Sequence, residues 1–244
     1  MNVTIFNAGW MTAARGLWRQ GEEEPEKPIK VPVSVYLIET GSERILVDTG
    51  LHPGAVADSV GHYGEGTAIG FFGLEQERSV ADQIELETVT MLVLTHLHFD
   101  HAGGLALIPD SVPVVIQRAE WEAGQDPEAV ARNFFLPQDY AEAPADITLI
   151  DGDHDLLGDG SVMLLSTPGH TPGHQSVQVG DLVIGADVAH YAHTLDDLQF
   201  PSFAADFDAQ RHSAERLRKL RDEGLTVLPG HDADVLQPGP VEAS

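Results

Sequence analysis

The sequence predicts a layered α/β protein, in which many short strands and a few helices pack in sheets and layers. Two observations indicate this class. Apolar runs of strand length recur throughout the chain, several of them rich in Val and Ile and bounded by Gly, Pro or Asp. Segments with the spacing of an amphipathic helix are fewer. A length of 244 residues suits one large domain or two small ones.

The expected strands follow one another along the chain at 31–38, 44–48, 91–95, 112–116, 147–150, 162–166, 175–179, 182–186 and 225–229. The clearest helix covers 208–223, with Asp near its start, basic residues in its second half and Gly224 placed to end it. Ala214, Leu217 and Leu220 give this helix one apolar stripe. Weaker helical patterns cover 54–60, 80–86 and 118–132.

Two stretches fit neither pattern. Residues 10–30 mix aromatic side chains with an acidic, proline-bearing run, and residues 61–73 place several glycines around Tyr63, Phe71 and Phe72. One interpretation is a pair of flexible surface loops, and the other is a lid or pocket wall that supplies apolar contacts. The 10–30 segment could equally clasp a second subunit, so a homodimer is a further expectation.

The composition excludes several classes of partner. The formal net charge is −26, and such a surface repels the phosphate backbone of nucleic acids. No apolar run approaches the roughly 20 residues of a membrane helix, and the N-terminal residues lack the basic and apolar regions of a signal peptide. We therefore expect a soluble, cytoplasmic protein with no nucleic-acid or membrane partner. Because the chain has no Cys, a metal ion would have to be bound by His, Asp or Glu.

The segment "THLHFDHAGG" at 95–104 predicts a metal site. It follows an expected buried strand, and it packs three His and one Asp into 96–101. If the chain stays extended through 96–100, the side chains of His96, His98 and Asp100 share one side. Clustered histidines repel one another when protonated and lose solvation when buried, and a bound metal ion removes both problems.

Further His and Asp residues follow three other expected strands. They are His170 and His174 in "STPGHTPGH", Asp187, His190, Tyr191 and His193 in "GADVAHYAH", and His231 and Asp232 in "LPGHDAD". Sites in α/β proteins commonly lie at the carboxyl ends of strands. Four strand ends that converge on one edge of a sheet would therefore make a single metal pocket.

These motifs resemble those of a known superfamily. "HLHFDH", "TPGHTPGH", "GAD" and "PGH", in this order and with "ILVDTG" at 45–50, resemble the metallo-β-lactamase-fold hydrolases. Within that superfamily, "VYLIETGSERILVDTGL", "VVIQRAEWEAG" and "TPGHTPGHQS" most resemble the N-acyl-homoserine lactonases, which quench bacterial quorum sensing. The matching blocks are spread over about 31–234. The resemblance implies a single αββα sandwich of four layers over 1–244, with the site at one edge of the paired sheets.

Carried over residue by residue, the resemblance implies two metal ions. The first would be bound by His96, His98 and His170, the second by Asp100, His101 and His231, and Asp187 would bridge both. Imidazole and carboxylate ligands without sulfur suit Zn²⁺, although Mn²⁺, Co²⁺ or Fe²⁺ could occupy the same ligands. Asp48 is expected to orient a ligand histidine, because a ligating imidazole usually donates its other N–H to a carboxylate or carbonyl. His174 and Asp232 are candidates for the same role.

The implied reaction is the opening of a lactone ring, most readily that of an N-acyl-homoserine lactone. Paired metal ions lower the pKa of a shared water towards 7, so a bridging hydroxide could attack the carbonyl while Asp100, or a metal-bound water, passes a proton to the leaving alkoxide. The developing oxyanion needs a further donor. Where the lactonases carry Tyr, three residues after the bridging aspartate, this chain has His190 followed by Tyr191, and both remain candidates.

Other activities stay open. The position of His190 is also His in organophosphate and ester hydrolases of the superfamily, so an esterase or a phosphotriesterase is one alternative. A glyoxalase II-like thioesterase is another, and a non-catalytic metal-binding protein is a third. The aromatic and apolar side chains that could line an acyl-chain channel are Trp10, Met11, Trp18, Phe71 and Phe72.

Overall fold

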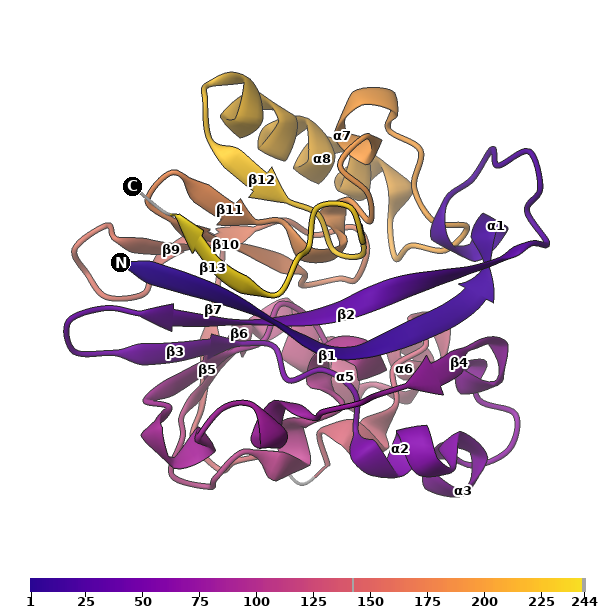
Figure 1. The fold of residues 1–244 in the computed structure, drawn as a ribbon, viewed down its shortest axis with the longest axis horizontal. Helices are drawn as coiled ribbons and strands as arrows, with labels where there is room; N and C mark the ends of the chain where they lie inside the picture. The colour runs from indigo at the N-terminus through magenta and orange to yellow at the C-terminus, as the bar shows by residue number, and fades with distance from the viewer. Residues whose placement is uncertain (142, 243–244) are drawn as a thin grey trace.

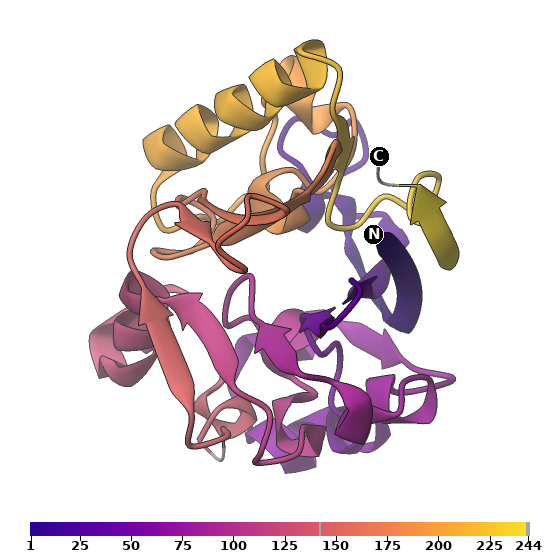
Figure 2. The same ribbon diagram turned by 90° about the vertical axis from the view of Figure 1, so that its left-hand side faces the viewer.

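Two β-sheets lie face to face in the computed structural model, which describes residues 1–141 and 143–242. Helices cover the outer face of each sheet, so the molecule has four layers in the order αββα (Figures 1 and 2). This arrangement confirms the expected fold class. Apolar side chains from both sheets, among them Ile38, Ile45, Leu164 and Ile184, fill the space between them.

The first sheet is the larger and is mixed. Its strands in spatial order are β13 (Gly239–Glu242), β1 (Asn2–Ala14), β2 (Pro28–Glu39), β3 (Arg44–Val47), β5 (Met91–Val93), β6 (Val114–Gln117) and β7 (Ile147–Ile150), and β4 (Gly73–Glu75) pairs with β1. The pairs from β3 to β7 are parallel, whereas β1 and β2 form an antiparallel hairpin. The carboxyl end of β5 points to the edge where the expected site lies.

The second sheet has the strand order β12 (Thr226–Leu228), β11 (Leu182–Ile184), β10 (Gln175–Val179), β9 (Val162–Ser166) and β8 (His154–Asp155). Here β11 and β12 are parallel, and the other pairs are antiparallel. Strands β9, β11 and β12 therefore run in the same direction, and their carboxyl ends meet at one edge. Each of the nine expected strands is present in one of the two sheets.

The helices are mostly short. They are α1 (Arg15–Trp18), α2 (Pro53–Ala57), α3 (Ser59–Tyr63), α4 (Phe99–Ala102), α5 (Arg118–Gln125), α6 (Pro127–Arg132), α7 (Thr194–Asp197) and α8 (Phe207–Asp222), with 3₁₀ turns at Ala68–Phe71, Val80–Asp82, Leu86–Thr88, Leu105–Leu107, Pro137–Asp139 and Ala186–Val188. The long helix near the C-terminus is confirmed as α8. The helix expected over 118–132 is divided by Asp126, which caps α6 ahead of Pro127. The prediction of a helix over 80–86 was wrong, because the chain forms two separate 3₁₀ turns there, at Val80–Asp82 and Leu86–Thr88.

The sequence pattern missed β1, the longest strand. Its pairing with β2 shifts register between Asn7 and Gly9, so Val3 and Ile5 before the bulge pack between the sheets while Met11, an even number of residues further on, packs in a different cluster. Gly9 has φ = 144°, a conformation that favours glycine. Together β1 and β2 cross the molecule and end beside α1 (Figure 1). Much of the 10–30 segment is thus regular structure at the far end of this hairpin.

The 61–73 segment is attached to the 3₁₀ turn at Pro137–Asp139 through a buried polar contact. The Tyr63 hydroxyl donates to Asp139 Oδ1 over 2.9 Å, and the Gln138 side-chain amide donates to the carbonyl of Tyr63 over 3.2 Å. Burial raises the pKa of Asp139 to about 8, although the hydrogen bond from Tyr63 opposes this shift. Asp139 is therefore protonated at neutral pH in the folded protein.

This shift predicts a pH dependence of stability. Asp139 has a higher pKa in the folded chain than in the unfolded chain, so its contribution is fully present below about pH 4 and is lost as the pH rises through 8. We expect Asp139→Asn to flatten the fall in the free energy of unfolding between pH 4 and 9, by an amount on the order of a few kcal/mol. Urea titrations of both proteins across this range measure it, and parallel curves would contradict it.

Among the described residues, no helix has both the length and the apolar character needed to cross a membrane.

Candidate metal centre

Four loops meet at the edge where the two sheets open. One follows β5 in the first sheet, and the other three follow β9, β11 and β12 in the second. The picture of a single sheet edge drawn from the strand pattern was therefore too simple, and the site lies at one edge of the paired sheets, as the family resemblance implied. The chain is also not extended through 96–100: α4 begins at Phe99, directly after His98. This turn of helix sends Asp100 and His101 to one group of side chains and leaves His96 and His98 in another.

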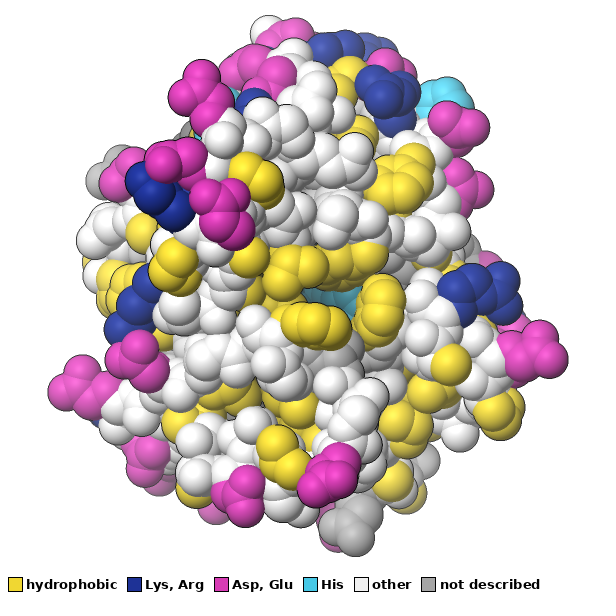
Figure 3. Space-filling model, turned by 90° about the vertical axis from the view of Figure 1, so that its right-hand side faces the viewer, with side chains coloured by type: hydrophobic (Ala, Val, Ile, Leu, Met, Phe, Trp, Pro, Cys, Tyr) yellow, Lys and Arg dark blue, Asp and Glu magenta, His cyan; other side chains and the backbone are white. Residues whose placement is uncertain are grey.

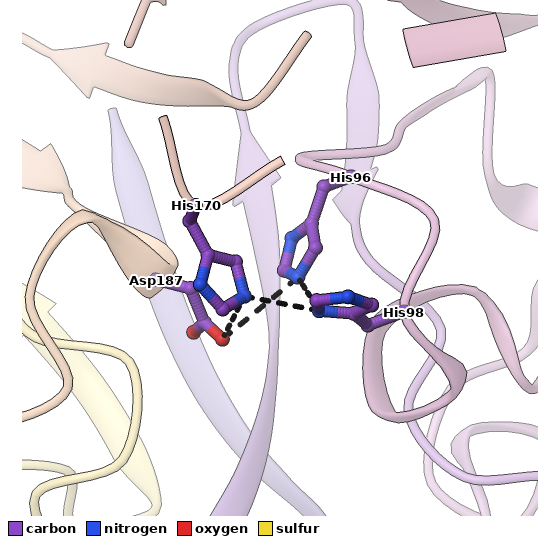
Figure 4. A group of neighbouring side chains, drawn as sticks. All are labelled: His96, His98, His170 and Asp187. Carbon is purple, nitrogen blue, oxygen red and sulfur yellow. Dashed lines mark hydrogen bonds and ion pairs between the residues drawn. The ribbon is translucent and has the colours of Figure 1, made fainter. Parts of the chain in front are cut away.

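The first group contains His96, His98, His170 and Asp187, all buried. His98 Nδ1 lies 3.1 Å from His96 Nε2 and 3.0 Å from His170 Nε2, and Asp187 Oδ2 lies 3.2 Å from His170 Nε2 (Figure 4). Figure 4 shows these ring nitrogens and the carboxylate pointing toward one central space. Three imidazole nitrogens and one carboxylate oxygen around a small volume could hold a metal ion.

The second group contains Asp100, His101 and His231, also buried. Asp100 Oδ2 lies 3.3 Å from His101 Nε2 and 3.4 Å from His231 Nε2. Asp187 Oδ1 lies 3.5 Å and 3.2 Å from the same two nitrogens. Asp187 Oδ1 thus faces the second group and Oδ2 the first, although Oδ2 also lies 3.4 Å from His231 Nε2, so the carboxylate stands between the groups and could bridge two ions.

Most of the imidazoles are oriented through their other ring nitrogen. His98 Nε2–H donates to the carbonyl of Asn133 over 2.8 Å, and His231 Nδ1–H donates to that of Pro32 over 2.9 Å. His96 Nδ1–H donates to the Thr95 hydroxyl over 3.1 Å. Each bond fixes the tautomer, so the nitrogen turned to the centre carries a free lone pair.

Asp48 orients His101 in the same way. Its Oδ2 accepts His101 Nδ1–H over 2.7 Å and the Thr95 hydroxyl over 2.8 Å, while its Oδ1 accepts the Thr95 N–H over 2.8 Å. Asp48 has φ = 61°, a left-handed conformation at the end of β3 that Asp tolerates better than most residues. A turn in a hairpin would not require these contacts, which tie the first sheet to the ligand loop.

His174 and Asp232 accept hydrogen bonds from the backbone rather than from a ligand imidazole. His174 Nε2 accepts the N–H of Asp187 over 3.1 Å, and its Nδ1–H donates to the Thr167 hydroxyl over 3.0 Å. His174 therefore holds the main chain of Asp187 in place. Asp232 Oδ2 accepts the N–H of Ala192 over 3.0 Å, which fixes the loop after β11 at a greater distance from the centre.

The electrostatics of the cluster favour cation binding. Burial by itself would raise the pKa values of Asp100 and Asp187, but the surrounding imidazoles lower both, that of Asp100 to about 2. Burial and neighbouring imidazoles lower the pKa of His96, and burial lowers that of His98 to about 3. Ionised carboxylates and neutral imidazoles are the forms that bind metal ions. Burial would also lower the pKa of His101, yet the nearby carboxylates raise it, so a bound cation would have to displace a proton there.

Two atoms at the centre lack hydrogen bonds. His101 Nε2 and Asp187 Oδ1 are buried and make no hydrogen bond of good geometry among the described residues, although Asp187 Oδ1 lies 3.2 Å from His231 Nε2. An unpartnered buried carboxylate oxygen is costly unless a cation compensates it. The residues present therefore fit a pair of divalent cations.

A cavity of about 240 Å³ opens above the cluster. Figure 3 shows apolar side chains around this hollow and a His side chain at its floor. Of the expected channel residues, Met11, Trp18, Phe71 and Phe72 line it, whereas Trp10 packs under Lys30 elsewhere. The remaining lining residues are Leu17, His98, Phe99, Asp100, Phe134, Leu136, His170, Asp187, His190, Ser202, Phe203 and His231.

His190 and Tyr191 face different surroundings. His190 lines the cavity, its Nε2 lies 3.2 Å from Asp187 Oδ2, and its Nδ1–H donates to the carbonyl of Trp18 over 3.2 Å. Tyr191 is absent from the cavity lining, and its ring stacks on that of His193. The loop after β11 is therefore not displaced by one residue in the way that would bring Tyr191 to the cavity.

Sequence reasoning missed Phe134, Leu136 and Phe203, which form much of the rim. Phe134 is 45 % exposed and has φ = 58°, an unusual backbone conformation for an aromatic residue. These residues follow α6 or precede α8, and no local motif marks them. Only the packing of the loops over the cluster brings them to the cavity.

Fold and side-chain cluster together are those of a metal-dependent hydrolase, with two groups of candidate metal ligands between the two sheets. Residues 28–231 match the family described as the metallo-beta-lactamase superfamily. An N-acyl homoserine lactonase of Bacillus cereus is 32% identical over 223 residues, which cover 86% of this chain and 85% of the relative. The lactonase AttM of Rhizobium radiobacter is 28% identical over 84% of this chain and 83% of its own length.

Solved structures agree with these matches. A mutant of AiiA from B. thuringiensis with N-decanoyl-L-homoserine bound at its active site superimposes with a TM-score of 0.83, at 26% identity, over 96% of this chain and 94% of that one. A lactone hydrolase with N-hexanoyl-L-homoserine at its catalytic metal centre gives a TM-score of 0.81. The chain belongs to the metallo-β-lactamase superfamily and, within it, to the family of the N-acyl homoserine lactonases.

Proposed function

We propose that this protein hydrolyses the lactone ring of N-acyl homoserine lactones with two bound zinc ions. One observation carries the proposal: the two oxygens of Asp187 face two separate groups of ligand side chains at the floor of an apolar-walled cavity. Relatives with the same fold are named for this activity, and two of the similar structures hold an acyl-homoserine product.

In this proposal the ligands of one ion are His96, His98 and His170, those of the other are Asp100, His101 and His231, and Asp187 serves both. Zinc fits because every ligand is an imidazole or a carboxylate. Ions bound there supply an acidified water as the nucleophile and an electrophile for the carbonyl oxygen.

Protein side chains complete the reaction. His190 lines the cavity beside Asp187, and its Nδ1 proton is engaged by the carbonyl of Trp18. Its Nε2 accepts a proton when the ring is neutral and donates to a developing oxyanion when the ring is protonated. The carboxylate of Asp100 also lines the cavity, where it would take the proton that the attacking water loses and pass it to the leaving alkoxide, which becomes the product hydroxyl.

The cavity walls supply binding energy for the acyl chain. Trp18 and Phe72 contact each other and pack with side chains of the β1–β2 hairpin, and Phe134 and Phe203 form a second aromatic pair in the cavity lining. Each buried methylene of a substrate chain contributes about 0.8 kcal/mol. The 10–30 and 61–73 segments thus act as pocket walls in this proposal.

A substrate panel tests the proposed activity. With zinc added, we expect the ratio kcat/KM to be highest for N-acyl homoserine lactones and to rise with acyl length until the cavity is filled. The comparison substrates are an aryl ester, a phosphotriester and a thioester, measured by release of acid or chromophore. A higher kcat/KM for the phosphotriester would replace the proposal with a phosphotriesterase, and no turnover of any substrate by zinc-loaded protein would indicate a binding protein.

A further inference from the structure

A buried carboxylate lies behind the metal centre and contacts two of its loops. Glu120, in the first turn of α5, is 0 % exposed. Its Oε1 accepts the N–H of Leu97 over 2.9 Å, and its Oε2 accepts the N–H of Gly173 over 2.7 Å. Leu97 lies between His96 and His98, and Gly173 lies in the loop that carries His170. One side chain therefore joins a ligand loop of the first sheet to a ligand loop of the second.

The second contact is close. A Cβ atom at position 173 would clash with the backbone nitrogen of Glu120, so only glycine lets the loop approach the start of α5. Just below, the Gln175 side-chain amide donates to the carbonyl of Leu94 over 2.8 Å, and that of Gln117 donates to Gln175 Oε1 over 3.0 Å. Glu120, Gln117 and Gln175 thus form a buried polar seam that joins the two sheets at the site.

The position of Glu120 is energetically costly. Burial raises its pKa to about 7, and the N–H groups of Leu97 and Gly173 and the Thr171 hydroxyl oppose this shift. No Lys or Arg forms an ion pair with it among the described residues. An apolar side chain of similar volume would avoid the cost of burying a charge but would leave two N–H groups without acceptors.

We propose that Glu120 is a positioning residue that sets the distance between the loop of His96 and His98 and the loop of His170, and so the affinity of the three-histidine metal site. This inference rests on the proposed ligand assignment. The three ligand nitrogens come from these two loops alone, and zinc binds nitrogen at about 2.0–2.1 Å, so small loop displacements weaken binding. Loss of an outer contact of this kind typically costs 10- to 100-fold in metal affinity.

Glu120→Gln tests the inference with little change in shape. A glutamine can accept only one of the two N–H groups through its oxygen, because its amide NH₂ would meet the other donor. We expect the affinity for one of two Zn²⁺ ions to fall 10- to 100-fold in competition with a chromophoric chelator, while the second ion binds as before. The control is Glu122→Gln, which removes the same charge from an exposed position on the same helix. This variant should bind both ions as tightly as the parent chain.

Thermal unfolding of the metal-free proteins separates this role from a merely structural one. The metal-free Glu120→Gln protein should unfold within a few degrees of the parent, while its stabilisation by added Zn²⁺ should be smaller. If Glu120→Gln does not fold, Glu120→Asp serves, because it keeps the charge but is one methylene too short to reach both loops. Unchanged affinity for both ions in the variant that folds would overturn the proposal. No lactone is used, so an error in the proposed substrate would not affect the result.

Discussion

Asp187→Asn is expected to abolish activity and to remove the paired metal site. Asp187 offers one oxygen to each ligand group, at 3.2 Å from His170 Nε2 and from His231 Nε2. An asparagine keeps the shape of the side chain but loses the charge and replaces one oxygen with an NH₂ group, which cannot bind a cation. We expect bound zinc to fall from two ions to at most one per chain, and kcat/KM for a homoserine lactone to fall on the order of a thousandfold or more.

Elemental analysis of the purified protein and steady-state kinetics measure both effects. Asp234→Asn is the matched control, because it removes the same charge at an exposed position near His231 in sequence. The control should keep two ions and full activity. If Asp187→Asn also kept two tightly bound ions, Asp187 would not be the bridge, and the ligand assignment built on it would fail.

The candidate ligands could be narrowed from the sequence because metal chemistry limits the choice, whereas the particular ligand set was implied by the family resemblance. With no Cys in the chain, only His, Asp and Glu remain as strong ligands, and they cluster just after apolar runs that had to be strands. The strands are either buried on both faces or alternate between buried and exposed residues, so the sequence pattern predicts them as strands. Both signals are local, and the structure brings together every side chain of the predicted ligand set.

The parts that escaped prediction depend on long-range packing. The bulge at Gly9 interrupts the alternation of buried and exposed residues in β1, so the sequence pattern did not predict this strand of 13 residues. Phe134 and Phe203 come from separate loops and meet only because both cover the same cavity. Glu120 carries no local sign of its role, since a Glu early in a helix is ordinarily solvent-exposed.

Replacing His190 is expected to slow catalysis without removing metal. His190→Ala should lower kcat by on the order of a hundredfold to a thousandfold, because it deletes the side chain that exchanges a proton or a hydrogen bond with the reacting carbonyl group. Tyr191→Phe should stay within about twofold of the parent, because the Tyr191 ring stacks on His193 and does not line the cavity. Both variants should retain two zinc ions, which elemental analysis checks in parallel with the kinetics.

A third variant at this position separates the two chemical roles. His190→Gln keeps an N–H donor but cannot take up a proton, so partial recovery of kcat relative to His190→Ala would assign an oxyanion contact, and none would assign proton transfer. The metal content matters because His190 shares a feature with the ligands: its Nδ1–H is held by a carbonyl, and its Nε2 lies 3.2 Å from Asp187 Oδ2. Loss of zinc from His190→Ala would therefore make this residue a ligand instead, and loss of activity in Tyr191→Phe would return the catalytic role to the tyrosine.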